Sequence, residues 1–294
     1  MPFNHKTPLL RIIAAFTSVA LAATLLGGCA AARLAYNNAP EVLHFYLDSQ
    51  FGFTEEQSDL VKAQLREVHA WHRSKELPER AKLLQKAQAQ ATQNTTSAQV
   101  CTLFDDLRPR LDSALARAVP GMAEVAVKAS PEQLLAWQKS FDKRNATFKA
   151  DHVSGTADAR LSKRLESAKS NYERFYGKLS EGQLAALRAS LERSGWDGAI
   201  ALREAQRRQQ DGLQTVKLLV ADKVGATEAE KRLAALMARS AQSPDSTYRA
   251  NAQKWQQDNC ERLATLHNSA TPEQRAKAMA TLQSYEADVR ALIR

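Results

Sequence analysis

Residues 54–72, TEEQSDLVKAQLREVHAWH, contain the pattern that decides the fold class. Thr54 is a good helix N-cap, and Gln57 stands three positions later, where its side chain can bond back to the amide of the cap. The residues that follow form one stripe with steps of four, three and four: Val61, Leu65, Val68 and His72. This spacing matches one face of an α-helix, so the stretch predicts a capped, amphipathic helix.

The same start, a Ser or Thr followed three positions later by Gln, recurs at Ser130, Ser180 and Thr271, and Thr227 has Glu in the third place. The pattern predicts helices over residues 40–50, 55–76, 78–93, 97–119, 131–150, 157–177, 181–193, 197–222, 228–242, 247–268 and 272–293. Breaks are expected after Leu77, where Pro78 would begin a new helix, and at Pro120 with Gly121. No segment alternates strictly over a strand length, so the fold class expected is all-α.

The composition agrees with a helical, globular chain. Of 294 residues, 25% are charged, 44% are hydrophobic and only 6% are aromatic, which excludes collagen-like, low-complexity and multi-spanning membrane classes. The helix starts are unevenly spaced, which argues against a solenoid of regular repeats. We expect one multi-helix, bundle-like domain, with two closely packed helical halves as the alternative.

The N-terminus has the pattern of a bacterial lipoprotein signal. Lys6 and Arg11 precede an apolar run over residues 12–26, which is shorter than the roughly 20 residues that span a bilayer. The run ends in Leu26-Gly27-Gly28-Cys29, which resembles a lipobox. The resemblance implies a cleaved signal peptide over residues 1–28, a lipidated Cys29 with a tether over residues 29–38, and an all-helical domain over residues 39–294. Acyl chains on Cys29 would hold the protein on a lipid bilayer, because two or more chains give stable anchoring.

The residue after Cys29 bears on the destination of the protein. In enteric-type sorting, Asp at this position retains a lipoprotein in the inner membrane, so Ala30 implies the outer membrane, facing the periplasm. The net charge of +9 has two interpretations: solvated helix faces, or attraction to anionic lipid or cell-wall polymer. No nucleic-acid partner is expected, because no recognised binding motif is present.

Two cysteines remain besides Cys29. Cys101 and Cys260 form an even pair in a compartment that is expected to be oxidising. A disulfide between them would close a long loop and stabilise the fold by about 4–5 kcal/mol in the chain-entropy model. Two buried free thiols are the alternative, and the sequence leaves both open.

A weak candidate site lies on the helix predicted over residues 55–76. His69 and His72 are three apart and Glu76 follows four later, a spacing that can place two imidazoles and a carboxylate on one face. A metal site needs a further firm ligand, and a half-buried structural histidine is the competing interpretation. No hydrolase, phosphate-loop or dinucleotide-binding motif is present, so we expect no enzyme activity, no cofactor and no metal. Trp137, Trp196 and Trp255 are expected to be core anchors.

Several unusual stretches cluster behind the lipobox. They are residues 34–40 (LAYNNAP), 47–48 (LD), 53–57 (FTEEQ), 71–73 (WHR) and 76–78 (ELP). This series resembles DUF6279, a family of uncharacterised proteobacterial lipoproteins, most specifically over residues 29–84. The resemblance implies a lipoprotein with a helical fold and implies no mechanism.

Three functions are therefore considered. The first is a non-catalytic helical lipoprotein that binds an envelope protein or a cell-wall component. The second is a chaperone-like or stress-related protein, because the helix starts are similar to the LTxxQ motifs of small periplasmic chaperones, although only Leu179 supplies the leading Leu. The third is a metal-dependent envelope hydrolase with His69, His72 and Glu76 as its site.

Overall fold

The computed structural model describes residues 28–293, which form an all-α fold without strands in that range. The elements are α2 (Gly28–Asn37), α3 (Ala39–Phe51), α4 (Glu55–Trp71), the π-helix η1 (His72–Glu76), α5 (Leu77–Ala91), α6 (Ser97–Ala126), α7 (Pro131–His152), α8 (Ala157–Tyr176), α9 (Glu181–Arg193), α10 (Gly198–Ala221), α11 (Ala226–Ala241), α12 (Ser246–Asn268) and α13 (Pro272–Ile293). The predicted signal peptide lies outside the described residues except for Gly28. The residues expected to form a tether are helical, in α2 and the turn at Asn38.

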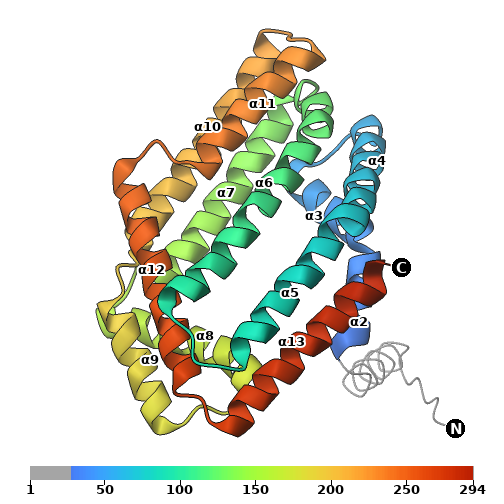
Figure 1. Ribbon diagram of the computed structural model, residues 1–294. Coiled ribbons are helices and arrows are strands. Elements are labelled where there is room, and N and C mark those ends of the chain that lie inside the picture. Colours follow the sequence, from blue (N-terminus) through green and yellow to red (C-terminus); the bar gives the residue numbers. More distant parts are fainter. Residues whose placement is uncertain (1–27, 294) are drawn as a thin grey trace, which may run out of the picture.

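The long helix α6 organises the molecule. It packs against α4, α11 and α12, while α10 lies along α7 and α5 lies along α13 (Figure 1). The first described helix, α2, contacts α13 near the C-terminus, where Arg33 Nε and Asp288 Oδ1 are 2.9 Å apart. The first and last described helices of the chain are therefore in contact.

Apolar side chains gather in two main clusters. One lies between α6, α10 and α11 and contains Val119, Ala123, Leu219, Ala229, Leu233 and Leu236. The other lies between α8, α9, α12 and α13 and contains Leu161, Tyr176, Leu179, Leu187, Leu191, Leu266 and Ala278. A small cluster of Val100, Cys260 and Ala264 joins α6 to α12. The helix α6 contributes to the first and third clusters, and α12 contributes to the second and third. These two long helices therefore connect the three clusters.

Most of the predicted helix starts carry the expected caps. Capping boxes with both reciprocal hydrogen bonds begin α4 at Thr54, α7 at Ser130 and α9 at Ser180. Thr271 and Gln274 exchange the same two bonds at the start of α13. The start predicted at Thr227 is wrong, because α11 begins at Ala226 behind Gly225 without a side-chain cap.

The glutamines of these caps also pair across helices. Gln57 Nε2 donates to Gln133 Oε1 and to the carbonyl of Lys128, and Gln133 Nε2 donates back to Gln57 Oε1 and to the carbonyl of Gly52. Each amide therefore closes its own cap and bonds the chain that precedes the other helix. We call this arrangement a glutamine pair.

A second glutamine pair has the same pattern. Gln183 Nε2 donates to Gln274 Oε1 and to the carbonyl of Ser269, while Gln274 Nε2 donates to Gln183 Oε1 and to the carbonyl of Lys178. The two pairs tie α4 to α7 and α9 to α13. The sequence motif that begins these helices therefore also joins them.

The break predicted at Pro120 and Gly121 is wrong, because α6 continues to Ala126. Val119 and Ala123 on either side are buried against α10 and α11, and this packing outweighs the hydrogen bond that proline removes. Gly121 has a packing role instead: a Cβ there would lie 2.3 Å from Gln64 Cγ of α4. Glycine at this position permits the close approach of α4 and α6.

Candidate functional site

The predicted site residues His69 and His72 lie against α2. The Tyr36 hydroxyl is 2.9 Å from His72 Nδ1, and the rings of Tyr36 and His69 have centroids 4.6 Å apart. Arg73 covers the other side, with its guanidinium carbon 5.4 Å from the Tyr36 ring centroid and Nη2 2.8 Å from Asn37 Oδ1. These contacts fasten α2 to α4 and the π-helix.

The π-helix explains how the chain passes Pro78. The amide of Leu77 donates to the carbonyl of His72, five residues back, so η1 contains one wide turn. Pro78 has no amide hydrogen, and its ring would crowd the carbonyl of Ser74 in a regular helix. The wide turn relieves this conflict, so α4, η1 and α5 follow one another without the break that the sequence predicts after Leu77.

Glu76 is buried, but its carboxylate has a different partner from the two histidines. Glu76 Oε2 lies 3.7 Å from Arg110 Nη1 on α6, and the same arginine donates from Nη2 to Glu79 at 3.0 Å. Within residues 28–293, no three His, Cys, Asp or Glu side chains come close enough to hold a metal ion. The structure thus gives His69 and His72 a tyrosine partner and gives Glu76 an arginine partner.

Burial favours the neutral forms of Tyr36, His69 and His72. Burial, followed by Arg73, lowers the pKa of His69, and burial, followed by Arg80, lowers the pKa of His72. Burial also raises the pKa of the Tyr36 phenol. The cluster is therefore an uncharged tyrosine–imidazole contact at neutral pH, which suits a structural joint between helices.

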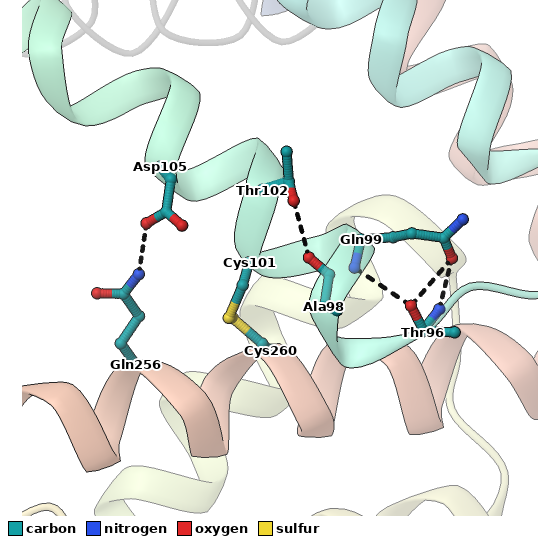
Figure 2. The surroundings of a disulfide bond; sticks show 8 residues. All are labelled: Thr96, Ala98, Gln99, Cys101, Thr102, Asp105, Gln256 and Cys260. Carbon is teal, nitrogen blue, oxygen red and sulfur yellow. Dashed lines mark hydrogen bonds between the residues drawn. A yellow bond between two sulfur atoms is a disulfide. The ribbon is translucent and has the colours of Figure 1, made fainter.

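Cys101 and Cys260 are joined in a disulfide that links α6 to α12, with Cα atoms 5.4 Å apart (Figure 2). Gln256 Nε2 donates to Asp105 Oδ1 one turn further along the same two helices, at 2.9 Å. Cys260 is fully buried. The disulfide therefore fixes the crossing of two helices that each contribute to the core.

Two of the cavities among the described residues concern us here, and no sequence motif indicated either. One, of about 440 Å³, is lined almost wholly by apolar side chains of α3, α4, α6, α7, α10 and α11, with the rings of Phe51, Phe53 and Trp137 on its wall. The other, of about 780 Å³, lies between α5, α6, α8, α12 and α13 and contains one buried arginine, Arg262. Trp255 lines the second cavity and is 44% exposed, so the expectation that it anchors the core is wrong.

Exposed apolar side chains follow Cys29, the second residue of α2, on two successive helices. Leu34 on α2 is 65% exposed and Phe45 on α3 is 77% exposed. Val42 and Tyr46 are also exposed, and they lie three residues before and one residue after Phe45 on the same helix. We call these four side chains the α2–α3 face. None of the described helices is long and apolar enough to span a bilayer.

No curated protein and no solved structure matches the chain. A family model described as a family of unknown function, DUF6279, matches residues 46–249. The match covers more than half of the chain; it begins at residue 46, so it leaves out residues 29–45, and it continues far past residue 84. The protein therefore belongs to the DUF6279 family.

Proposed function

We propose that the protein is a non-catalytic lipoprotein of the bacterial outer membrane, anchored through acylated Cys29, whose helical domain binds another envelope component. The observation that carries this proposal is the α2–α3 face, which begins five residues after Cys29. Large apolar side chains that gather on a water-exposed surface are typical of interaction sites. A bilayer that holds the acyl chains of Cys29 lies within reach of this face.

The face adds weak binding to the anchor. Full burial of a Leu, Val or Phe side chain contributes about 1.5–3 kcal/mol, and a bilayer interface buries only part of each. Such contacts are too weak to retain the protein alone, but they orient a domain that acyl chains already hold. In this orientation α2 and α3 lie at the membrane.

The test uses the full chain expressed in a Gram-negative host with an alkyne-tagged fatty acid. We expect the label on the wild type and on Cys101→Ala, which is the control for other cysteines. We expect no label on Cys29→Ala, and an Ala30→Asp variant is expected to move from the outer to the inner membrane fraction. Label that persists in Cys29→Ala, or an unlabelled wild type, contradicts the proposal.

A chaperone-like role is the second candidate, and the apolar cavity of about 440 Å³ favours it. Gln133 of the first glutamine pair lines that cavity, so one of the Ser-x-x-Gln helix starts adjoins a surface suited to apolar segments. A holdase assay decides this candidate. Suppression of client aggregation at equimolar protein supports it, and unchanged aggregation removes it.

A metal-dependent hydrolase is the weakest candidate. His72 contacts Tyr36, whereas Glu76 contacts Arg110, so the residues of this candidate do not share one site. We expect no hydrolysis of peptidoglycan, ester or phosphoester substrates. Turnover that is lost in His69→Ala or His72→Ala would revive this candidate.

A further inference from the structure

The cavity of about 780 Å³ between α5, α6, α8, α12 and α13 has the size of a small-molecule site, for which about 300–1,000 Å³ is usual. Its walls are mainly apolar, with Leu103 of α6, Phe175 of α8, Leu263 of α12 and Leu282 of α13 among the lining residues. Phe104 and Trp255 also line it and are exposed to solvent, so aromatic rings stand where the cavity meets water. The shape and lining suit an alkyl chain.

One cation interrupts the apolar wall. Arg262 of α12 is only 8% exposed, and it donates from Nε to Ser190 Oγ at 3.1 Å and from Nη1 to Asn259 Oδ1 at 2.5 Å. Its Nη2 is buried and makes no hydrogen bond. Within residues 28–293, no carboxylate forms an ion pair with Arg262, whereas the buried Glu204 is bonded by two arginines. A buried guanidinium with neutral partners and an unused donor is costly, and an anion beside it would remove that cost.

The surroundings strengthen this positive character. No Asp or Glu is among the residues that line the cavity, and His267, which lines it too, has a pKa lowered by burial, so its neutral form is favoured and Arg262 supplies the positive charge of the lining. Arg164 of α8 lies close enough that, after burial itself, the charge of Arg262 lowers its pKa. A cationic guest would be repelled here, and a purely apolar guest would leave Arg262 with no counter-charge other than Asp258, whose carboxylate is already bonded to Lys254 and to the amide of Gly195.

From this arrangement we propose that the cavity binds a single-chain amphiphile with an acidic head group, with its chain along the apolar walls and its carboxylate or phosphate at Arg262. The two head groups share one chemistry, because each accepts charge-assisted hydrogen bonds from a guanidinium. The disulfide lies beside this site, since Val100 and Asn259, which line the cavity, are the chain neighbours of Cys101 and Cys260. It holds α6 and α12 at a fixed separation beside the guest.

The first experiment varies the ligand and leaves the protein unchanged. Dodecanoate, dodecyl phosphate, dodecanol and dodecyltrimethylammonium are titrated into the full mature chain below their micelle concentrations, with calorimetry as the readout. We expect at least one of the two anions to bind, dodecanol to bind at least about tenfold more weakly, and the cation not to bind. A stronger response to dodecanoate indicates a fatty acid, and a stronger response to dodecyl phosphate indicates a phosphate-headed lipid. Equal affinities for acid and alcohol, or no binding of either anion, would overturn the proposal.

The second experiment changes the protein. Arg262→Met keeps the apolar stem and removes the charge, so we expect dodecanoate and dodecanol to bind this variant equally. Arg188→Met is the matched control, because Arg188 is a surface arginine paired with Asp158 and Glu192, and it should keep the preference for acid. Should Arg262→Met fail to fold, Ala252→Phe, which fills part of the cavity, is expected to weaken all chain-bearing ligands. Retained acid preference in Arg262→Met, or unchanged binding in Ala252→Phe, contradicts the assignment.

Discussion

At the scale of single residues, buried histidines make stability depend on pH. The pKa values of His69, His72 and His267 are lowered, first by burial, so the folded protein binds fewer protons than the unfolded chain just below pH 6.5. Their contribution is present above that pH and is lost as the pH falls through the lowered values.

We therefore expect the urea midpoint of the wild type to fall between pH 7.5 and 5.5. His72→Gln should show a shallower decline, because one of the three groups no longer titrates. Identical pH dependence in the two proteins would show that His72 has the same pKa in the folded and unfolded states.

Glu204 provides a test in a more acidic range. Burial by itself raises the pKa of Glu204, but hydrogen bonds from Arg207, Arg208 and Ser243 outweigh burial and bring it to about 2. Glu204→Gln should cost about 2–3 kcal/mol at pH 7, less than a fully buried pair, because both arginines reach water. The matched surface variant Glu192→Gln should cost less than about 1 kcal/mol.

The pH dependence of this pair follows from the lowered pKa. The stabilisation by Glu204 is complete above its unfolded value near 4.5 and disappears as the pH falls toward about 2. Denaturation curves should therefore show wild type and Glu204→Gln converging with acidification. A constant difference between them would contradict this origin of the stabilisation.

Which residues the sequence reveals depends on whether they belong to a pattern. Cys101 and Cys260 were recognisable as an even pair, although their bonding was open. Arg262 is one of 41 Lys and Arg residues, and only its tertiary surroundings distinguish it. Glu76 shows the same limit, because helix spacing placed it near the two histidines but could not reveal Arg110 on α6.

At the scale of helices, the sequence predicted starts better than ends. A capping box lies within four residues, so Thr54, Ser130 and Ser180 could be identified directly. The continuation of α6 through Pro120 depends on burial against helices far along the chain, which no local rule contains. The wide turn before Pro78 accommodates the missing amide and the ring of proline, where the sequence rule predicted a break.

The glutamine pairs yield a prediction at this scale. Gln57→Ala should destabilise the protein more than Gln99→Ala, because Gln99 closes the cap of α6 without pairing with another glutamine. Loss of a cap costs about 1 kcal/mol, and the lost contacts of the almost fully buried Gln57 should add about 1–3 kcal/mol.

A double-mutant cycle measures the pairing itself. The combined variant Gln57→Ala with Gln133→Ala should be less destabilised than the sum of the two single variants, because the second change removes a partner that is already unpaired. Strict additivity would mean that the two amides do not interact in solution.

At the scale of the whole molecule, the disulfide connects distant parts of the chain. Its cysteines are 159 residues apart, and closing such a loop stabilises by up to about 5 kcal/mol in the chain-entropy model. A reducing agent should lower the melting temperature of the wild type. The double variant Cys101→Ser with Cys260→Ser should melt at a lower temperature than the oxidised wild type. Its melting temperature should be the same with and without the reducing agent. Two free thiols detected in the wild type after unfolding without reductant would indicate that the bond is not formed.

The sequence predicted the all-α architecture because helical periodicity extends over nearly the whole chain. It left open how the helices assemble, since the pairing of α5 with α13 and of α6 with α12 depends on contacts between distant segments. The two cavities arise from that assembly, and they were therefore inaccessible to motif analysis.

We propose above that acyl chains on Cys29 hold this helical domain on a membrane. Intact-mass and N-terminal peptide mass spectrometry of the protein extracted from membranes tests it most directly. We predict a chain that begins at Cys29, with a diacylglyceryl group on sulfur and an acyl group on the new amino terminus. A chain that retains residues 1–28, or one that begins at an unmodified Cys29, would contradict the account.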